Sequence, residues 1–546
     1  MTTLAGTVSL AAAPVLPIAL VGAWLWPALR ERMSLLLIVA PVPALFASVL
    51  AAGGPGITFW RGLVPVTLML DTPGAILLGV SSLLWIAGAV YTAQAWRSSP
   101  AGWQFAICWL LTLAGSVGVF VTADLASFFL AYTLVSLPAY GLIVQEDTPP
   151  ARRAGVVYMA YAILGETILL MAFAFLAAAT PAGSLSIHDT VAALAGSPWR
   201  GAAVALLILG FGMKIALVPL HVWMPLTYRA APIPAAAVLS GAGVKAGVIG
   251  LIRFLPLSTP LPGASTTLAA VGLLGAFYGV ALGVTREHPK TVLAYSSISQ
   301  MGVIAAILGM GLAAGDAGAS IPVAFYAAHH VLAKGALFLA VGAAVAARAR
   351  GRTLVLGSAL IVALGLGGLP LTGGALAKLG AKATLGTGAV GTLGNLSAAG
   401  TTLLMLHFAR RLRAEPSSEV TAPEPSWPMG SYLTLAAASV LIPWALYPLA
   451  TGASRASVFA LDALWASLWP VLLGALLAVL WFRRGKQALR VSTAGVVRPG
   501  VYLSKVASRC GEAIESVERR LRQWPAASSS LVLAAILLCA AMLVAR

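Results

Sequence analysis

The feature that most constrains this chain is a succession of apolar segments, each long enough to cross a lipid bilayer as a helix. A span needs about 20 apolar residues, because the hydrocarbon layer is about 30 Å thick and a helix rises about 1.5 Å per residue. The sequence predicts sixteen crossings, at residues 8–28, 34–53, 73–93, 104–121, 123–145, 157–179, 201–219, 232–254, 265–284, 293–312, 322–346, 354–388, 391–409, 432–451, 464–482 and 529–545. We therefore expect an all-α polytopic membrane protein with about 16 transmembrane helices.

The composition excludes other classes of protein. Only 9% of the 546 residues are charged and 60% are hydrophobic, whereas soluble domains carry about 25% charged residues. The apolar runs do not alternate, which excludes a transmembrane β-barrel. The first run lacks a basic n-region and a clear small-residue cleavage site, so we interpret it as a span. Nucleic acid is not an expected partner, because the net charge of +18 is scattered over short loops.

The basic residues in the loops predict an orientation. They are concentrated after the odd-numbered crossings, whereas the loops after even-numbered crossings carry few. The clusters are Arg30/Arg32, Arg97, Arg152/Arg153, Arg229, Arg286/Lys290, Arg348/Arg350/Arg352, Arg410/Arg411/Arg413 and Arg483/Arg484/Lys486. The positive-inside rule places these loops in the cytoplasm and both termini in the periplasm of a bacterial inner membrane.

Two crossings are predicted to be broken helices. The sequence GGLPLTGG at 367–374 interrupts the twelfth crossing, and Pro219 and Pro225 interrupt the seventh. Proline and glycine end helices, and irregular backbone at membrane depth persists only where protein or water satisfies its polar groups. Such breaks mark binding sites in many transporters.

Two segments near the C-terminus have a different character. Residues 414–428 are polar and rich in proline, and predict a cytoplasmic linker. Residues 501–524 place apolar side chains every three or four positions, which predicts an amphipathic helix on a surface before the last span. This helix either joins two spans without further contacts or touches lipid headgroups or a neighbouring subunit.

Charged side chains inside the apolar runs are the main functional signal. The lysines are Lys214, Lys245, Lys334 and Lys378, with Lys382 one turn further on, and the one central acid is Glu166. A charge at the bilayer centre costs about 2.5–3.5 kcal/mol on insertion scales. That cost is offset if the lysines line a hydrated interior, pair with the acid, or lose their proton. A row of such groups can pass a proton along. For Lys382 an alternative stays open, namely that its ammonium extends to the lipid interface.

Polar neighbours are expected to support this relay, namely His221, His329, His330, Thr133, Ser297 and Lys382. His221 follows Lys214 by seven residues, two turns along one face of a helix, and His329 and His330 precede Lys334. These histidines are either structural or part of a hydrated path. Hydroxyl and amide groups occur in the tenth crossing, at Ser296, Ser297, Ser299 and Gln300, although serine also serves helix packing.

No motif for a redox cofactor or a metal is present in the sequence. There is no CxxC pair, no P-loop and no GxGxxG after a strand, and the adjacent histidines have no carboxylate partners. The cysteines, Cys108, Cys510 and Cys539, have neither metal nor disulfide spacing. We expect no cofactor, no metal and no redox centre of the chain's own.

Four segments together resemble a known family. They are GFGMKIALVPLHVWMPLTYRAAPIPAAAVLSGAGVKAGVIGLIRF, HPKTVLAYSSISQMG, HHVLAKGALFLAVG and GLPLTGGALAKL. In the same order, they are similar to signatures of the antiporter-like membrane subunits of respiratory complex I, of Mrp cation/proton antiporters, and of energy-converting hydrogenases and related formate-oxidising complexes. The likeness runs from about residue 65 to residue 410.

The resemblance implies two inverted five-helix repeats, crossings four to eight and nine to thirteen, with the seventh and twelfth helices broken. It divides the chain into residues 1–100, 101–260 and 261–412, followed by 413–482 and a final part, 483–546. It also implies roles for the lysines. Lys214 is the pump lysine of the first repeat, Lys245 the connecting lysine, Lys334 the central relay and Lys378 the terminal lysine.

Two departures from the family are visible. Relatives carry Trp-Glu in the fifth crossing, where this chain has Tyr132 and Thr133, so Glu166 on the next helix is the candidate replacement for the missing acid. Relatives also often carry Asp and His after the proline of WMPLTYRAAP. These departures leave open an altered coupling, a different ion or a specialised branch.

We expect a proton-translocating subunit of a redox-driven membrane complex, with other membrane and peripheral subunits and the lipid bilayer as partners. The fifth crossing favours a hydrogenase or formate type over complex I itself. The alternatives are an Mrp-type Na⁺/H⁺ antiporter subunit, the membrane partner of an inorganic-carbon (bicarbonate) uptake complex, and a structural scaffold without transport.

Overall fold

A computed structural model describes residues 4–23, 25–60, 66–96, 102–180, 183–416 and 426–491. Within these ranges, 14 helices are long and apolar enough to cross a membrane. The predicted amphipathic helix at 501–524, the predicted final span at 529–545 and most of the predicted linker lie outside the described residues. The prediction of a polytopic, mainly helical membrane protein is confirmed, and the total of sixteen crossings stays a prediction.

The helices follow one another along the chain with short connections. They are α1 (Leu4–Ala23), α2 (Pro27–Arg30), α3 (Met33–Val39), α4 (Val42–Leu50), α5 (Thr72–Trp96), α6 (Trp103–Val121), α7 (Leu125–Ser136), α8 (Ala139–Ile143), α9 (Pro149–Ala179), α10 (Ile187–Ala193), η2 (Leu194–Gly196), α11 (Arg200–Lys214), α12 (Trp223–Ala230), α13 (Ile233–Val238), η3 (Leu239–Gly243), α14 (Lys245–Phe254), α15 (Pro262–Gly283), α16 (Pro289–Ala314), η4 (Ala317–Ala319), α17 (Ser320–Ala346), α18 (Ala349–Gly367), α19 (Gly373–Leu385), α20 (Ala389–Ala414), α21 (Ser426–Thr451), η5 (Arg455–Phe459) and α22 (Leu461–Val491).

Both predicted helix breaks are present. The seventh crossing consists of α11 and α12, which are separated by residues 215–222 around Pro219. The twelfth consists of α18 and α19, which are separated by residues 368–372 around Pro370. Each break contains a non-glycine residue with positive φ, Ala216 at 57° and Leu371 at 65°. Such backbone is uncommon outside glycine, so both breaks are held in place by their surroundings.

Two further irregularities were not predicted. The fifth crossing is interrupted between α7 and α8 at Leu137 and Pro138. The eighth contains a π-helical turn, η3, directly before Lys245. Turns of this kind insert one residue into a helix and are frequent at functional sites. The small residues SGAG at 240–243 were the available signal for this turn.

A short β-hairpin is an addition to the predicted all-α architecture. Strands β1 (Ile57–Trp60) and β2 (Val66–Leu68) pair in antiparallel fashion. Leu68 also bridges to Thr122, and Asp124 bridges to Ser186, which ties the hairpin to the loops after α6 and α9. We call this end of the bundle the hairpin face. Asp124 caps α7 by accepting a hydrogen bond from the Ser127 amide at 2.9 Å.

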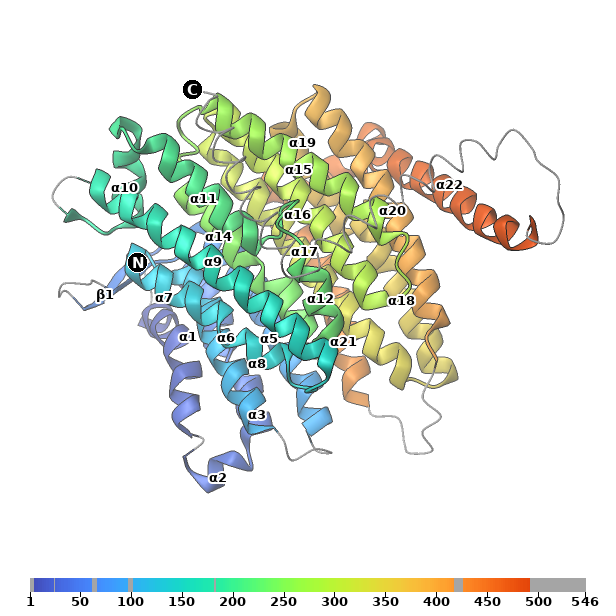
Figure 1. Ribbon diagram of the computed structural model, residues 1–546, viewed down its shortest axis with the longest axis horizontal. Helices are drawn as coiled ribbons and strands as arrows, with labels where there is room; N and C mark the ends of the chain where they lie inside the picture. Colours follow the sequence, from blue (N-terminus) through green and yellow to red (C-terminus); the bar gives the residue numbers. More distant parts are fainter. Residues whose placement is uncertain are drawn as a thin grey trace.

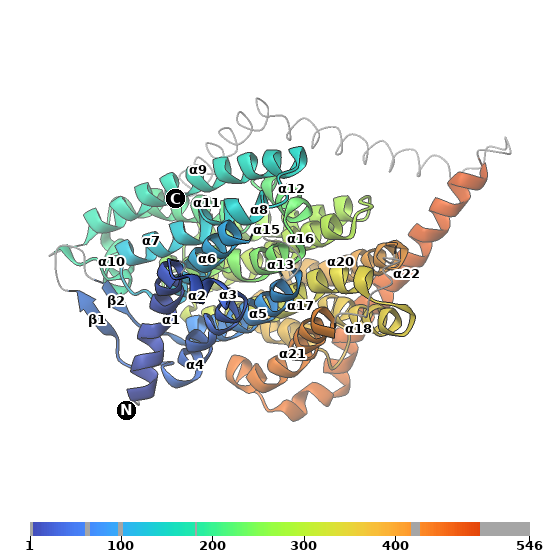
Figure 2. The same cartoon turned by 90° about the horizontal axis from the view of Figure 1, so that it is seen from below.

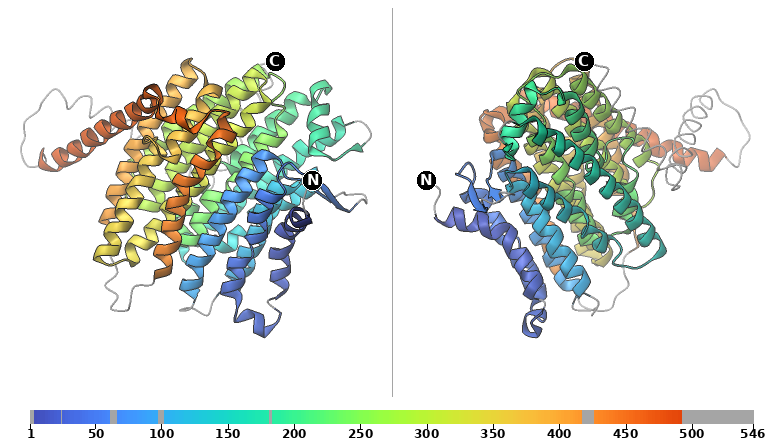
Figure 3. Two further views of the ribbon diagram at one scale, coloured as in Figure 1. Left: turned by 180° about the vertical axis from the view of Figure 1, so that it is seen from behind. Right: turned by 60° about the vertical axis from the view of Figure 1, so that its left-hand side comes forward.

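The helices form a broad bundle with a buried centre. The segment Ile233–Phe254 is its innermost span, whereas α1 to α4 and α22 lie on opposite sides of the bundle (Figure 1, Figure 2). Figure 3 shows the N-terminal helices leaning away from the bundle. They pack on α5 and α6, and α22 packs on α20. The peripheral helices expose large apolar side chains, as lipid-facing helices do.

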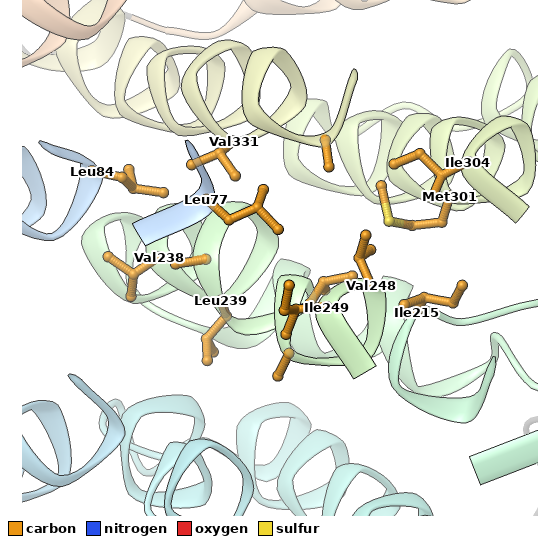
Figure 4. Packing of buried hydrophobic residues seen from close by; sticks show 14 of the residues in the cluster. Leu77, Leu84, Ile215, Val238, Leu239, Val248, Ile249, Met301, Ile304 and Val331 are labelled. Atoms are coloured by element: carbon orange, nitrogen blue, oxygen red, sulfur yellow. The ribbon is translucent and has the colours of Figure 1, made fainter. Parts of the chain in front are cut away.

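The centre is held by small residues and interlocking aliphatic side chains. In Figure 4, Val238 of the innermost span is drawn below Leu84 of α5, and Val248 of the same span below Met301 of α16. Helices α15 and α16 approach so closely that a Cβ at Gly272 or Gly302 would collide with the carbonyl oxygen of the other glycine. Close contact of this kind drives helix association in lipid, where burial alone gains little.

An ion pair fastens three helices together at the hairpin face. Arg253, at the end of α14, donates to both carboxylate oxygens of Asp71, at 2.7 and 3.0 Å. It also donates to the carbonyls of Val119, Phe120 and Thr122 at the end of α6. Asp71 in turn accepts from the Gly74 amide in the first turn of α5. The guanidinium therefore joins α5, α6 and α14.

We expect Arg253→Met to lower the free energy of unfolding by about 2 kcal/mol, because Asp71 and three carbonyls lose a shared donor. Burial raises the pKa of Asp71, but the charge and hydrogen bonds of Arg253 outweigh burial and hold that pKa below its usual value. The ion pair therefore stabilises the fold above about pH 4 and loses its effect as pH falls through the lower folded-state pKa. Thermal unfolding of the purified protein against pH is the measurement. A deficit in Arg253→Met that does not narrow in acid contradicts this account.

Candidate functional site

Glu166 and Lys214 are brought together beside α7. Lys214 Nζ donates a hydrogen bond to Ser136 Oγ at 2.8 Å, and Thr133 Oγ1 donates to Glu166 Oε2 at 3.4 Å. Thr133 and Ser136 are three residues apart, so they lie on one face of α7. Ser136 also contacts Glu166, so within the described chain this hydroxyl lies between the two charges, which form no direct ion pair. Thr133 was predicted to support the site and Ser136 was not.

Both charged groups face protein and not lipid. Glu166 is 8% exposed and Lys214 is 9% exposed. A cavity of about 20 Å³ lies against Lys214, with Ser136, Tyr158 and Tyr161 among its walls. This volume is enough for one water molecule. Glu166 Oε1 is buried and has no hydrogen-bond partner among the described residues, so it is free to accept one from water.

Two tyrosine rings flank the Lys214 ammonium. Nζ lies 5.4 Å from the ring centroid of Tyr132 and 5.8 Å from that of Tyr158. An aromatic face attracts a cation, so these rings stabilise a charged lysine in a site with little water. Tyr132 occupies the position next to the family's missing acid, which gives the departure in the fifth crossing a physical role.

Lys245 and His330 meet at the centre of the bundle. Lys245 is the first residue of α14, directly after the π turn, and His330 lies on α17. Lys245 Nζ lies 2.9 Å from His330 Nδ1, and both side chains are 0% exposed. His330 Nε2 is buried and has no hydrogen-bond partner among the described residues. One ring nitrogen is therefore engaged by the lysine and the other is open.

Lys334 continues the row on α17. It follows His330 by four residues and so shares its helix face, as predicted. Lys334 Nζ donates to the Leu293 carbonyl of α16 at 2.8 Å, and Ser297 Oγ donates to the same carbonyl at 3.2 Å. Ser297 is thus placed beside Lys334. Its role in a relay stays a prediction.

Lys378 lies across the second helix break. It belongs to α19, but its Nζ donates to the Gly367 carbonyl, the last residue of α18. An ammonium at the C-terminus of a helix is stabilised by the helix dipole. His329 packs against the start of α19, where a Cβ at Gly373 or Gly374 would come within 2.9–3.0 Å of its ring.

Two candidates are placed differently from the prediction. Lys382 is exposed, which agrees with the alternative that its ammonium extends outward. His221 does not share a helix face with Lys214, because α11 ends at Lys214 and the spacing of seven residues crosses the break. Its ring packs instead against Tyr278 of α15, with centroids 4.7 Å apart.

A narrow gap separates Lys214 from Lys245. Gly247, on the first turn of α14, packs on Lys214, because a Cβ there would lie 3.0 Å from Lys214 Cβ. A second cavity, of about 10 Å³, lies between Lys214, Thr227 and Val244. Its volume is at the lower limit for one water. Among the described residues, no hydrogen bond joins Lys214 to Lys245. The described part of the chain also contains no group of three or more His, Cys, Asp or Glu side chains that could hold a metal ion.

Comparisons with known proteins give a consistent picture. The family model described as "NADH:quinone oxidoreductase/Mrp antiporter, TM" matches residues 122–385, which contain Glu166 and the predicted relay lysines Lys214, Lys245, Lys334 and Lys378. A similar experimental fold is found in the "Structure of Mrp complex from Dietzia sp. DQ12-45-1b". It has a TM-score of 0.67 and 22% sequence identity, and covers 88% of this chain and 100% of the matched chain. At this identity the likeness is one of fold.

Curated relatives come from three kinds of complex. Hydrogenase-4 component B of Escherichia coli is 29% identical over 51% of this chain and 43% of its own length. NADH-quinone oxidoreductase subunit N of Salinispora tropica is 32% identical over 59% of this chain and 64% of its own length. A Na(+)/H(+) antiporter subunit of Alkalihalophilus pseudofirmus is 28% identical over 52% and 57%, respectively. The chain thus spans about half the length of the curated relatives that it matches.

The resemblance predicted from the sequence is confirmed by these matches: residues 122–385 match the family model for the transmembrane region of NADH:quinone oxidoreductases and Mrp antiporters.

Proposed function

We propose that this chain translocates protons as an antiporter-like subunit of a larger membrane complex. The observation that carries the proposal is the 2.9 Å contact of Lys245 with His330 in a fully buried setting. Removing ionisable groups from water costs several kcal/mol each, and apolar side chains would fill the same space at lower cost. Groups retained at such cost are candidates for function.

The proposed path begins at Glu166 and Lys214. The Ser136 hydroxyl accepts from Lys214 and also contacts Glu166, so by turning its O–H away from the Tyr132 carbonyl it can pass a proton between the carboxylate and the amine without movement of a helix. Transfer onward to Lys245 needs a water molecule in the gap beside Val244. Hydration of that gap is therefore the step at which transport is controlled.

The path continues through the centre of the bundle. An imidazole accepts a proton at one nitrogen and releases one at the other, and His330 has Nδ1 on Lys245 and Nε2 open. Lys334 lies on the same helix face. His329, which packs at the start of α19, leads from there to Lys378.

Partner subunits supply the driving force in this proposal, because the sequence has no redox motif. Relatives named as a hydrogenase-4 component and as an NADH-quinone oxidoreductase subunit support a redox-driven complex. We favour the hydrogenase or formate type, since Tyr132 and Thr133 stand where relatives carry Trp-Glu in the fifth crossing. The proposed partners are further membrane and peripheral subunits and the lipid bilayer.

We also propose that the hairpin face is periplasmic, in a bacterial inner membrane, with both termini on that side. The basic loops after odd-numbered crossings support this orientation. We further propose that 101–260 and 261–412 are inverted repeats. One broken crossing in each half, with Ala216 and Leu371 at positive φ, supports that division.

Lys214→Met and Lys378→Met are each expected to reduce driven proton transport at least about tenfold, because each removes one station that cannot be bypassed. The measurement is proton uptake into inverted membrane vesicles that contain the native complex, driven by the complex's own substrate. Lys382→Met is the matched control. Lys382 is exposed, so this variant should transport protons at the wild-type rate. Normal transport in both test variants would refute the relay.

A sodium/proton antiporter is the second candidate, favoured by the relative named as a Na(+)/H(+) antiporter subunit. In a redox-driven proton pump, proton transport stops without substrate and is indifferent to sodium. In an antiporter, a sodium gradient alone drives proton movement. We expect the first result when vesicles are tested with sodium and no substrate. Sodium-driven proton flux that Lys214→Met abolishes would establish the antiporter instead.

The stability of lysine variants tests the scaffold alternative. Lys245→Met keeps side-chain length and removes a buried ionisable group, so we expect thermal stability to be unchanged or higher. Arg253→Met is the control, because that cation bonds Asp71 and three carbonyls and its loss should destabilise. A comparable fall in unfolding temperature for both variants would indicate that Lys245 is structural.

A further inference from the structure

Five aromatic rings gather between Lys214 and the hairpin face. They are Phe128 and Tyr132 of α7, Phe173 of α9, Phe211 of α11 and Phe254 of α14. Neighbouring centroids lie 4.7–6.4 Å apart, within the range of aromatic contact. Every one of these side chains is at most 5% exposed. We call this group the aromatic seal.

The position of the seal follows from α7. Asp124, the N-cap, and then Phe128, Tyr132 and Ser136 recur every four residues, so each is the neighbour of the next along a stripe that winds slowly around this helix. Asp124 lines a cavity of about 1120 Å³ at the hairpin face, and Ser136 lines the small cavity at Lys214. Twelve residues of helix correspond to about 18 Å. The two aromatic turns thus occupy the interval between the two cavities.

Helix α14 gives the same placement independently. Ile252, Arg253 and Leu255 line the large cavity, and Phe254, between them, is fully buried in the seal. Phe254 is therefore the direct sequence neighbour of two residues in the wall of the large cavity. None of the five rings is among the lining residues of the large cavity, so the cavity ends beside the seal and does not enter it.

The rings are packed too tightly for water to pass. Phe254 lies 4.7 Å from Phe173 and 4.9 Å from Phe128, measured between centroids. The Phe211 ring fills the space beside Gly250, where any Cβ would collide with it. Apart from the Tyr132 hydroxyl, the five side chains offer no polar atom. Apolar constrictions of this kind exclude water and block ions by dewetting.

We infer that the aromatic seal insulates Lys214 from the hairpin-face cavity, so that a proton on Lys214 has Lys245 as its next station and no exit at the hairpin face. The inference rests on the proposed function of proton translocation. It assigns a role to Phe128, Phe173, Phe211 and Phe254, which hold no charge and bind no ion. The large cavity and the Lys214 site are separated by about 18 Å along α7. Without the aromatic rings, water could fill this interval and protons could leak back across the membrane.

The test opens the seal and measures passive leak. Phe173→Ser is expected to raise passive proton flux at least about tenfold in liposomes holding the purified complex, under a potassium diffusion potential and with no substrate. Phe175→Ser is the matched control. Phe175 lies two residues further along α9, partly buried, and stacks on Trp199 with centroids 5.3 Å apart, outside the seal. Its flux should stay at the wild-type level.

A second variant and a second readout guard against misfolding. Phe254→His keeps a ring of similar volume and adds polar nitrogens, so it should leak in the same way. Accessibility is read separately with Ser136→Cys, after replacement of the three native cysteines, by reaction with a membrane-impermeant thiol reagent applied from each side. Cys at 136 should react from the hairpin side only when Phe173→Ser is also present.

Two results would overturn the inference. One is that the Ser136→Cys variant reacts from the hairpin side equally well with and without Phe173→Ser. The other is that folded Phe173→Ser and Phe254→His leak no more than Phe175→Ser. Addition of Lys214→Met should suppress the leak, because the path runs past that amine. A failure of the proposed function would show as normal substrate-driven transport in Lys214→Met alone. That result is separate from the passive leak measurements, which test the seal.

Discussion

The contact between Lys245 and His330 sets the conditions that the rest of the structure must meet. Two ionisable groups, each fully buried, lie 2.9 Å apart where a membrane protein would ordinarily place aliphatic side chains. Their cost is lowered by surrounding acceptors, such as the Leu293 carbonyl that receives the neighbouring Lys334 ammonium at 2.8 Å. The apolar packing around them has to be close, because a loose centre would admit water everywhere and not only where a proton is to move.

Helix irregularities provide most of the places where a lysine can be held. Lys214 is in the last turn of α11, and Lys378 reaches back to the last carbonyl of α18. Both ammonium groups thereby lie near helix C-termini, where unpaired carbonyls and the helix dipole favour a cation. Lys245 begins the helix after a π turn. The breaks that interrupt the spans are thus part of the electrostatic design, and a continuous helix would offer none of these acceptors.

The lysines, Glu166 and both helix breaks were predictable because they contradict their surroundings. A lysine in an apolar run and a Pro-Gly cluster inside a span can be recognised from the sequence alone. Ser136 was not conspicuous, since a serine in a membrane helix usually bonds its own backbone. The relation between His221 and Lys214 failed because the spacing argument assumed a continuous helix across the break at Pro219.

The aromatic seal could not be foreseen for a related reason. Its rings come from four helices, and a phenylalanine in a membrane span is ordinary by composition. Only their convergence beside Ser136 and Lys214 distinguishes them from lipid-facing residues. Patterns within one helix are readable from sequence, whereas a site assembled from several helices requires the tertiary packing.

In the proposed function, conduction and insulation are carried by the same helices at adjacent turns. Tyr132 lies one turn from Ser136 on α7, and Phe211 lies one turn from Lys214 on α11. Gly250 receives the Phe211 ring and Gly247 packs on Lys214, so α11 and α14 are locked together along the whole interval from the seal to the lysine. The motion that hydrates the gap to Lys245 must then come from the other side of Lys214, where α11 ends and the break at 215–222 begins. Movement there can admit water between the lysines while the aromatic rings stay closed.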